Sequence, residues 1–389
     1  MENSKVSLVT LYLGFYKGEK YLESLFNQIQ SQDNQNFKIL VVDNNSPNVT
    51  KKMFKDWEKA YKDKFQFIQN NNNYGAHGSL FKNLNNISTP WFCTLHQDDF
   101  YKPNHVSTII NLIAKGGEDI VGVSTTMGSM TNSGKIMNSK PRVNWFSPNL
   151  DQPGQFLQNL KAQAVPFPAT AFKLNVFKQT KVPIHSASFS DTEQTLRMLG
   201  YGRFVSSQIE TMLYRENPNS ESHVLNEKEL ITGAAVALTR VFCSNEFDTI
   251  LEIVDRSKRE AFAHQLIKAL THRVPKGDLL TVLENIALEQ MISKWGYSQK
   301  KISRLLGSNY AKQSSWQTVK TINNLSHIFI RVNQQQKMPG NQSLNSRVWD
   351  FYFNSKIISS KSLNKLFLKL IYKMIFLIRP NHRMKNRWK

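Results

Sequence analysis

Residues 37–46 read Phe-Lys-Ile-Leu-Val-Val-Asp-Asn-Asn-Ser, an apolar run that ends in the carboxylate of Asp43. Such runs are typical of strands buried on both faces of a parallel sheet. A second run, Trp91 to Leu95, is also followed by carboxylates, Asp98 and Asp99. Because open α/β sheets bind ligands beyond the carboxyl ends of their strands, these acidic side chains are candidates for one shared site.

The segments around these runs alternate between strand and helix patterns. Lys5 to Leu13 and Phe65 to Ile68 read as further strands, and apolar residues recur at helical spacing from Glu19 to Ile29. Residues 120–124 read as another strand, and about 128–165 as a loop-rich stretch. This order predicts an α/β fold with a doubly wound sheet and helices on both faces.

Length and composition indicate a globular chain with more than one part. With 389 residues, 40% of them hydrophobic, wholesale disorder and a collagen-like fibre are excluded. Helical periods replace strand patterns from about Leu225, so we expect a first domain at 1–224, a helical extension at 225–350 and a tail at 351–389. The two cysteines, Cys93 and Cys243, form neither a disulfide framework nor a zinc motif, which favours a cytoplasmic location.

The positive charge of the chain is concentrated in its second half. Residues 225–389 hold 27 Lys+Arg and 11 Asp+Glu, whereas the whole chain holds 50 and 29. In the tail, Lys361, Lys365, Lys369 and Lys373 recur every four residues opposite apolar side chains. This spacing predicts a basic amphipathic helix on an anionic membrane surface, within residues 361–389. The alternative is a helix that packs on the protein's own core with its lysines outward.

A nucleic-acid partner is the competing interpretation of this charge. Ser298 to Gly307 superficially resembles part of a helix-turn-helix, but it is one short match, and ordinary helix packing explains it as well. The main expectation is therefore that no nucleic acid binds.

The acidic side chains suit a ligand with a base, a ribose and a diphosphate. Asp43 is a candidate acceptor of hydrogen bonds from the base or ribose. Asp98 and Asp99 are candidate ligands of a divalent cation that bridges phosphate oxygens. Each aspartate also has an ordinary alternative, because Asp after a strand is a common helix cap or turn former.

Seven short motifs follow one another along the first half of the chain. They are Val6 to Val9, Tyr16 to Leu25, Ile39 to Ser46, Asn73-Tyr74-Gly75, His96-Gln97-Asp98-Asp99 with Phe100 to Pro103, Ser190 to Glu193 with Leu196-Arg197 and Gly200-Tyr201, and Tyr214 to Ser222. In this order they resemble the family 2 glycosyltransferases, whose GT-A fold implies that the doubly wound sheet is mixed. The resemblance covers about residues 5–222.

The resemblance implies a role for each matching residue. Asp191 would be the general base of an inverting sugar transfer, its alternative being a helix cap, and Asp98 and Asp99 would bind Mg²⁺ or Mn²⁺. The nucleotide-sugar donor would contact Tyr16, Asp43, Asn45, Asn73, Gly75, Lys82, Asp98 and Arg215.

The sequence departs from the family pattern at three positions. His96 stands where many relatives have an acidic residue, and imidazole suits manganese better than magnesium. Asn217 replaces a common histidine, and Leu80 stands where a basic residue is expected, with Lys82 the nearest substitute.

The expected function is transfer to a saccharide acceptor, lipid-linked, in surface polysaccharide or lipopolysaccharide synthesis. The enzyme would work at the inner face of the cell membrane as a peripheral protein. The alternative is a non-catalytic protein that binds a nucleotide sugar or nucleic acid.

Overall fold

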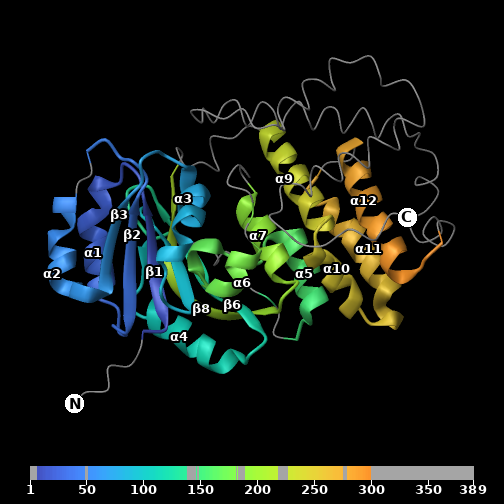
Figure 1. Ribbon diagram of the computed structural model, residues 1–389, viewed down its shortest axis with the longest axis horizontal. Coiled ribbons are helices and arrows are strands. Elements are labelled where there is room, and N and C mark those ends of the chain that lie inside the picture. The colour runs from blue at the N-terminus through green and yellow to red at the C-terminus, as the bar shows by residue number, and fades with distance from the viewer. Residues whose placement is uncertain are drawn as a thin grey trace.

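The computed structural model describes residues 7–48, 51–137, 146, 149–180, 182, 189–217, 227–274 and 278–298. Within them, an eight-stranded sheet has the order β3-β2-β1-β4-β7-β6-β8-β5, with helices on both faces (Figure 1). The strands are β1 (Val9–Phe15), β2 (Phe37–Asp43), β3 (Phe65–Gln69), β4 (Trp91–His96), β5 (Phe100–Tyr101), β6 (Ile120–Thr131), β7 (Thr170–Lys173) and β8 (Arg203–Glu216).

The helices cover the sheet and continue beyond it. Those of the first 224 residues are α1 (Leu22–Gln30), α2 (Lys55–Tyr61), α3 (Gly75–Asn83), α4 (His105–Gly116), α5 (Gln152–Ala162), α6 (Leu174–Gln179) and α7 (Ser190–Met198). The later ones are α9 (Glu227–Phe242), α10 (Asn245–Ile253), α11 (Arg259–Leu270) and α12 (Asp278–Trp295).

The strand pairing creates the edge at which a ligand can bind. β1 pairs in parallel with β2 on one side and with β4 on the other, so the strand order reverses at β1. β7 runs antiparallel to both β4 and β6, which makes the sheet mixed. The expected fold class is confirmed, and the carboxyl ends of β1, β2 and β4 lie side by side at the switch point.

Alternate side chains of the strands enter two different cores. Leu11 and Leu13 of β1 pack with α1, α2 and α4, whereas Tyr12 between them joins the opposite core. That second core includes α5, α7 and the helices α9 to α12. The helical extension therefore shares its hydrophobic core with one face of the sheet, while the division of the chain near residue 224 stays a prediction.

Two local expectations differ from the structure. β1 runs through Gly14 to Phe15, because both residues still pair with β2. The stretch 128–165, expected to be mainly loop, contains the end of β6 and all of α5. The Asp151 side chain caps α5 by accepting a hydrogen bond from the Gly154 amide, and Gly128 to Thr131 of β6 are held by pairing with Leu213 to Glu216 of β8 rather than by apolar alternation.

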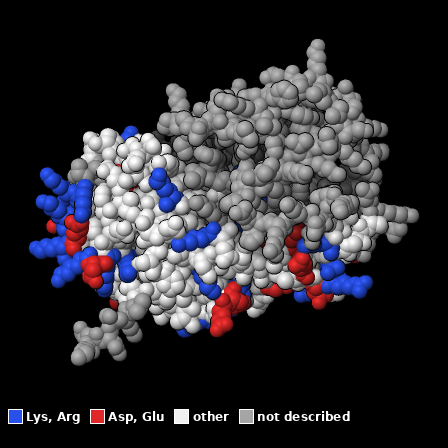
Figure 2. Space-filling model, viewed as in Figure 1, with Lys and Arg blue, Asp and Glu red and all other residues white. Residues whose placement is uncertain are grey.

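Basic side chains gather at the end of the molecule where α2 lies (Figure 2). Exposed Lys51, Lys52, Lys55 and Lys59 belong to α2 and the turn before it. Lys51 pairs with Glu58 at 3.0 Å, and Asp56 is also exposed on this helix. The acidic neighbours moderate this patch, which reads as a solvated face.

One titratable group is buried in the fold without a charged partner. His105 begins α4, is 1% exposed, and places Nδ1 2.7 Å from Oγ1 of Thr211. Burial lowers the pKa of His105 from 6.5 to about 4. The folded protein therefore keeps this imidazole neutral where the unfolded chain protonates it.

This shift predicts acid sensitivity. Between about pH 6.5 and pH 4 the unfolded state binds more protons, so the free energy of unfolding falls as the pH falls, by up to roughly 3 kcal/mol from this group. In the variant His105→Asn, which keeps a polar atom toward Thr211 but does not titrate, the loss is smaller. Urea unfolding across this range measures both proteins, and equal pH slopes would contradict the assignment.

Candidate functional site

The segments that follow β1, β2 and β4 are joined by hydrogen bonds. The side-chain amide of Gln97 accepts from the Tyr16 backbone N–H at 2.9 Å and donates to the Tyr16 carbonyl at 2.9 Å. The Lys17 amide donates to Oγ of Ser46 at 2.8 Å. Tyr16 itself remains partly exposed, so this predicted donor contact lies at the rim of the site on a fixed backbone.

Asp43 is fully buried and already accepts several hydrogen bonds. Its carboxylate receives the Ser46 amide at 3.1 Å and the side-chain amide of Gln69 at 3.0 Å. Asn45, two residues on, has a left-handed backbone with φ 66°. The turn-forming alternative for Asp43 is thus observed, and contact of Asp43 or Asn45 with a nucleotide stays a prediction.

A chain of asparagine amides holds the loop between β3 and α3. Asn44 donates to Oδ1 of Asn73 at 2.7 Å and to the Gly75 carbonyl at 3.2 Å, and it accepts from the Tyr74 amide. Asn70 donates to Oδ1 of Asn44 at 3.2 Å. Gly75 has φ 71°, a conformation that favours glycine, so the predicted Asn73 and Gly75 stand in a constrained loop.

Lys82 lies over this loop rather than free in solvent. Its ammonium donates to the Tyr74 hydroxyl at 2.9 Å and sits 4.3 Å from the centre of that ring. The Lys82 ammonium can bind a phosphate only if it leaves the Tyr74 hydroxyl. Its contact with the nucleotide-sugar donor stays a prediction.

The two neighbouring aspartates after β4 have different surroundings. The side chain of Asp99 is 1% exposed, and its Oδ1 accepts the Arg215 amide at 2.9 Å. Asp98 is only partly buried. The Arg215 guanidinium donates to the Asp98 carbonyl at 2.6 Å and to the Asn132 carbonyl at 2.8 Å, so it ties β8 to this turn.

The acidic side chains available here fit a metal ion whose ligands come mainly from a bound nucleotide. Among the described ranges, no three His, Cys, Asp or Glu side chains group closely enough to hold an ion. Mg²⁺ and Mn²⁺ bound with nucleotides need only one or two carboxylates, with phosphate and water completing the shell. Asp98 is accessible for this, whereas Asp99 anchors β8 and contacts Nδ1 of His96 at 3.6 Å.

Asp191 stands in the first turn of α7 and is held from two sides. Its Oδ1 accepts the Thr192 amide at 2.6 Å, and its Oδ2 accepts the side-chain amide of Gln163 at 2.6 Å. The cap position of α7 is Phe189, so Asp191 lies inside the helix. A carboxylate with these two donors keeps further lone pairs for a ligand.

Two histidines lie within electrostatic reach of Asp191. Burial lowers the pKa of His77 on α3, while Asp191 acts to raise it and His96 to lower it further. Partial burial likewise lowers the pKa of His96 against the pull of Asp98 and Asp191. The charge of Asp191 on α7 therefore acts both on His77 of α3 and on His96 at the end of β4.

His77 and Gln163 are site residues that the sequence reading missed. The His77 ring centre is 5.1 Å from that of Phe167, and its Nε2 is buried with no hydrogen-bond partner within the described part of the chain. The position of His77, two residues after Gly75 in the Asn-x-Gly loop, was the available signal. Nothing local marks Gln163, which reaches Asp191 from the end of α5.

The mixed sheet, with carboxylates at the ends of β2 and β4 and at the start of α7, is the arrangement expected from the resemblance to the GT-A class. Residues 11–180 match the family model described as Glycosyl transferase family 2. The resemblance predicted from the motifs is confirmed.

Individual relatives are more distant. An uncharacterized glycosyltransferase of Haemophilus influenzae is 28% identical over 129 residues, 33% of this chain and 38% of that protein. A teichoic acid poly(glycerol phosphate) polymerase of Staphylococcus epidermidis is 28% identical over 91 residues, 23% of this chain and 13% of that protein. The crystal structure of S. aureus TarS 1–349 aligns with a TM-score of 0.46 and 16% identity over 78% of this chain and 93% of that one, too weak a likeness to carry function.

Proposed function

We propose that the chain is a glycosyltransferase that moves a sugar from a nucleotide-sugar donor to an acceptor hydroxyl. The observation that carries the proposal is the position of Asp191, a partly exposed carboxylate in the first turn of α7 that accepts a hydrogen bond from Gln163 at 2.6 Å. The family match supports the same reaction class.

The geometry suits a single displacement. Asp191 would accept the proton of the acceptor hydroxyl while that oxygen bonds to the anomeric carbon. The bond from this carbon to the diphosphate oxygen breaks at the same time, and its electron pair leaves with the nucleoside diphosphate. One displacement from the opposite side inverts the anomeric centre, so we propose an inverting enzyme.

Asp98 is the residue that would hold a divalent metal with the donor. The metal, when bound, would neutralise charge on the departing diphosphate. Asp99 would keep β8 and the turn after β4 in place through its hydrogen bond with the Arg215 amide. Gln97 would keep Tyr16 at the rim of the donor site.

The acceptor and the cellular site are finer parts of the proposal. We propose a lipid-linked saccharide acceptor in the synthesis of a surface polysaccharide or lipopolysaccharide, at the inner face of the membrane. No helix among the described residues is long and apolar enough to cross a bilayer. Residues 361–389, expected to contact the membrane, lie outside the described residues, as do residues 299–307 of the nucleic-acid alternative.

The base assignment predicts a selective loss of transfer. Asp191→Asn keeps the size of the side chain but accepts no proton, so transfer falls by about 100-fold or more. Binding of the nucleoside diphosphate stays within about twofold, because the donor contacts lie elsewhere. A panel of sugar nucleotides with the purified protein measures transfer, and exposed Asp63→Asn is the matched control. Full transfer activity in Asp191→Asn would show that Asp191 is not the general base.

The two aspartates after β4 predict different effects on ligand binding. A nucleoside diphosphate with Mn²⁺ or Mg²⁺ raises the melting temperature of the wild-type protein, and a chelator reduces the rise. Asp98→Asn abolishes the metal-dependent part while leaving the melting temperature of the free protein nearly unchanged. Asp99→Asn lowers that melting temperature instead, because it weakens a buried hydrogen bond. The opposite pattern would make Asp99 the metal ligand.

The tail predicts membrane binding. Full-length protein sediments with vesicles that contain anionic lipid, and deletion of residues 361–389 reduces the bound fraction about tenfold or more. Neutral vesicles are the control. If the deletion changes nothing, the tail is not the membrane contact, and the exposed lysines of α2 become the surface to test.

A further inference from the structure

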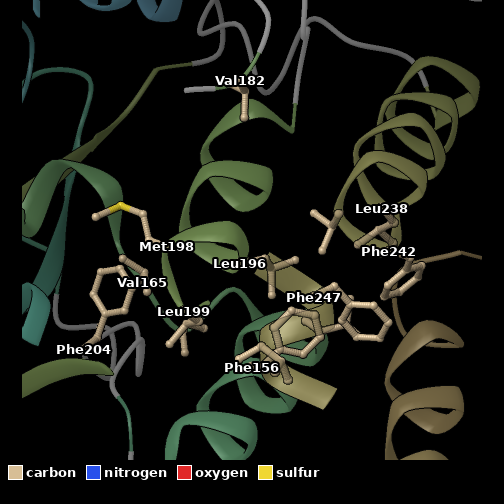
Figure 3. Close-up of a cluster of buried hydrophobic side chains, with 14 of the residues drawn as sticks. Phe156, Val165, Val182, Leu196, Met198, Leu199, Phe204, Leu238, Phe242 and Phe247 are labelled. Carbon is tan, nitrogen blue, oxygen red and sulfur yellow. The ribbon is translucent and has the colours of Figure 1, made fainter. Parts of the chain in front are cut away.

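Helix α7 is enclosed by the helical extension. Leu196 on α7 lies beside Leu238 and Phe242 of α9 and Phe247 of α10, and Leu199, the residue that ends α7, belongs to the same core (Figure 3). All five side chains are buried. The helix that carries Asp191 thus has one apolar face covered by residues beyond 224, and it cannot move independently of them.

A buried ion network joins α7 to the same helices. Glu193, two residues after Asp191, is fully buried, and its Oε2 accepts from Arg240 at 3.0 Å and 2.6 Å. Arg197 lies 3.7 Å from Glu193 and 3.3 Å from Glu246. A buried carboxylate held by a planar guanidinium has a defined direction, since two N–H groups meet its oxygens.

The end of α7 also touches the extension closely. A Cβ placed on Gly200 would lie 2.6 Å from Cα of Glu246 on α10, a distance that real side chains do not adopt. The helix is therefore fixed near its start by Arg240 and beyond its end by α10. These two contacts define its position along its own axis.

The partner of Asp191 is held from the extension too. Arg273, which follows α11, donates to the carbonyl oxygen of Leu160 at 2.7 Å and to that of Asn159 at 3.3 Å. Both carbonyls belong to the last turn of α5, just before Gln163. The Asn159 side chain in turn donates to Oγ1 of Thr195 on α7 at 2.9 Å.

We propose that the helical extension positions the catalytic carboxylate, with Arg240 as the positioning residue that orients α7 and Arg273 as the one that orients the turn bearing Gln163. The inference rests on the proposed function for its consequence on catalysis. Residues 227–274 then act as part of the catalytic unit, although none of the described ones among them need touch the substrate.

The test replaces Arg240 by lysine, which keeps the charge but loses the two-pronged contact. Hydrogen exchange of α7 amides becomes about tenfold faster or more, with exchange in β1 and β2 unchanged. The kcat of transfer falls about tenfold or more because a small displacement of a reacting group is costly, while KM for the donor stays within about twofold. The exposed Arg256→Lys is the matched control and changes neither readout.

Three results would overturn the inference. Unchanged α7 exchange in Arg240→Lys removes the positioning contact, and faster exchange with unchanged kcat removes its link to catalysis. Equal loosening of β1 and β2 with a raised donor KM shows a merely structural role. If Arg240→Lys does not fold, Arg273→Lys, which loses the contact with the Leu160 and Asn159 carbonyls, is measured for the same readouts. If the wild-type protein transfers no sugar, the proposed function fails, while the exchange experiment still decides whether Arg240 positions α7.

Discussion

A buried negative charge on Glu193 connects α7 to α9 and α10. A carboxylate removed from water has to be paired, and leaving it unpaired costs several kcal/mol. Arg240 from α9 supplies that pair, with Arg197 and Glu246 extending it to α10. Because Glu193 is two residues from Asp191, the need to neutralise one side chain also determines where the proposed base lies.

The same rule acts on neutral groups at the other side of the site. Buried amides must find partners, and those of Asn44, Asn70 and Asn83 find one another or the loop before α3. The loop bearing Asn73 and Gly75 is consequently shaped by the interior beneath it. The loop before α3 and the helix α7 are thus both held in place by buried polar groups that need partners within the protein.

Burial also separates residues that look equivalent in the sequence. Asp98 and Asp99 are adjacent, yet Asp99 faces inward to the Arg215 amide while Asp98 stays accessible. The charge of Asp191 acts on both His77 and His96, but of these two histidines His77 alone has a ring nitrogen that is buried with no hydrogen-bond partner among the described residues. From residue type alone, the two aspartates would be given one role and the two histidines another.

Local patterns in the sequence determined the class of fold and the edge of the sheet that carries the site, because apolar period and strand-end carboxylates are properties of neighbouring residues. The motifs around Asp43, Asp98 and Asp191 belong to that level, and so does the helical character of α11 and α12. Only the tertiary structure decided that the Asp99 side chain accepts the Arg215 amide, that Gln163 donates to Asp191, and that Arg240 pairs with Glu193. These contacts connect residues 28 to 116 positions apart, and their partners are selected by burial rather than by any nearby pattern.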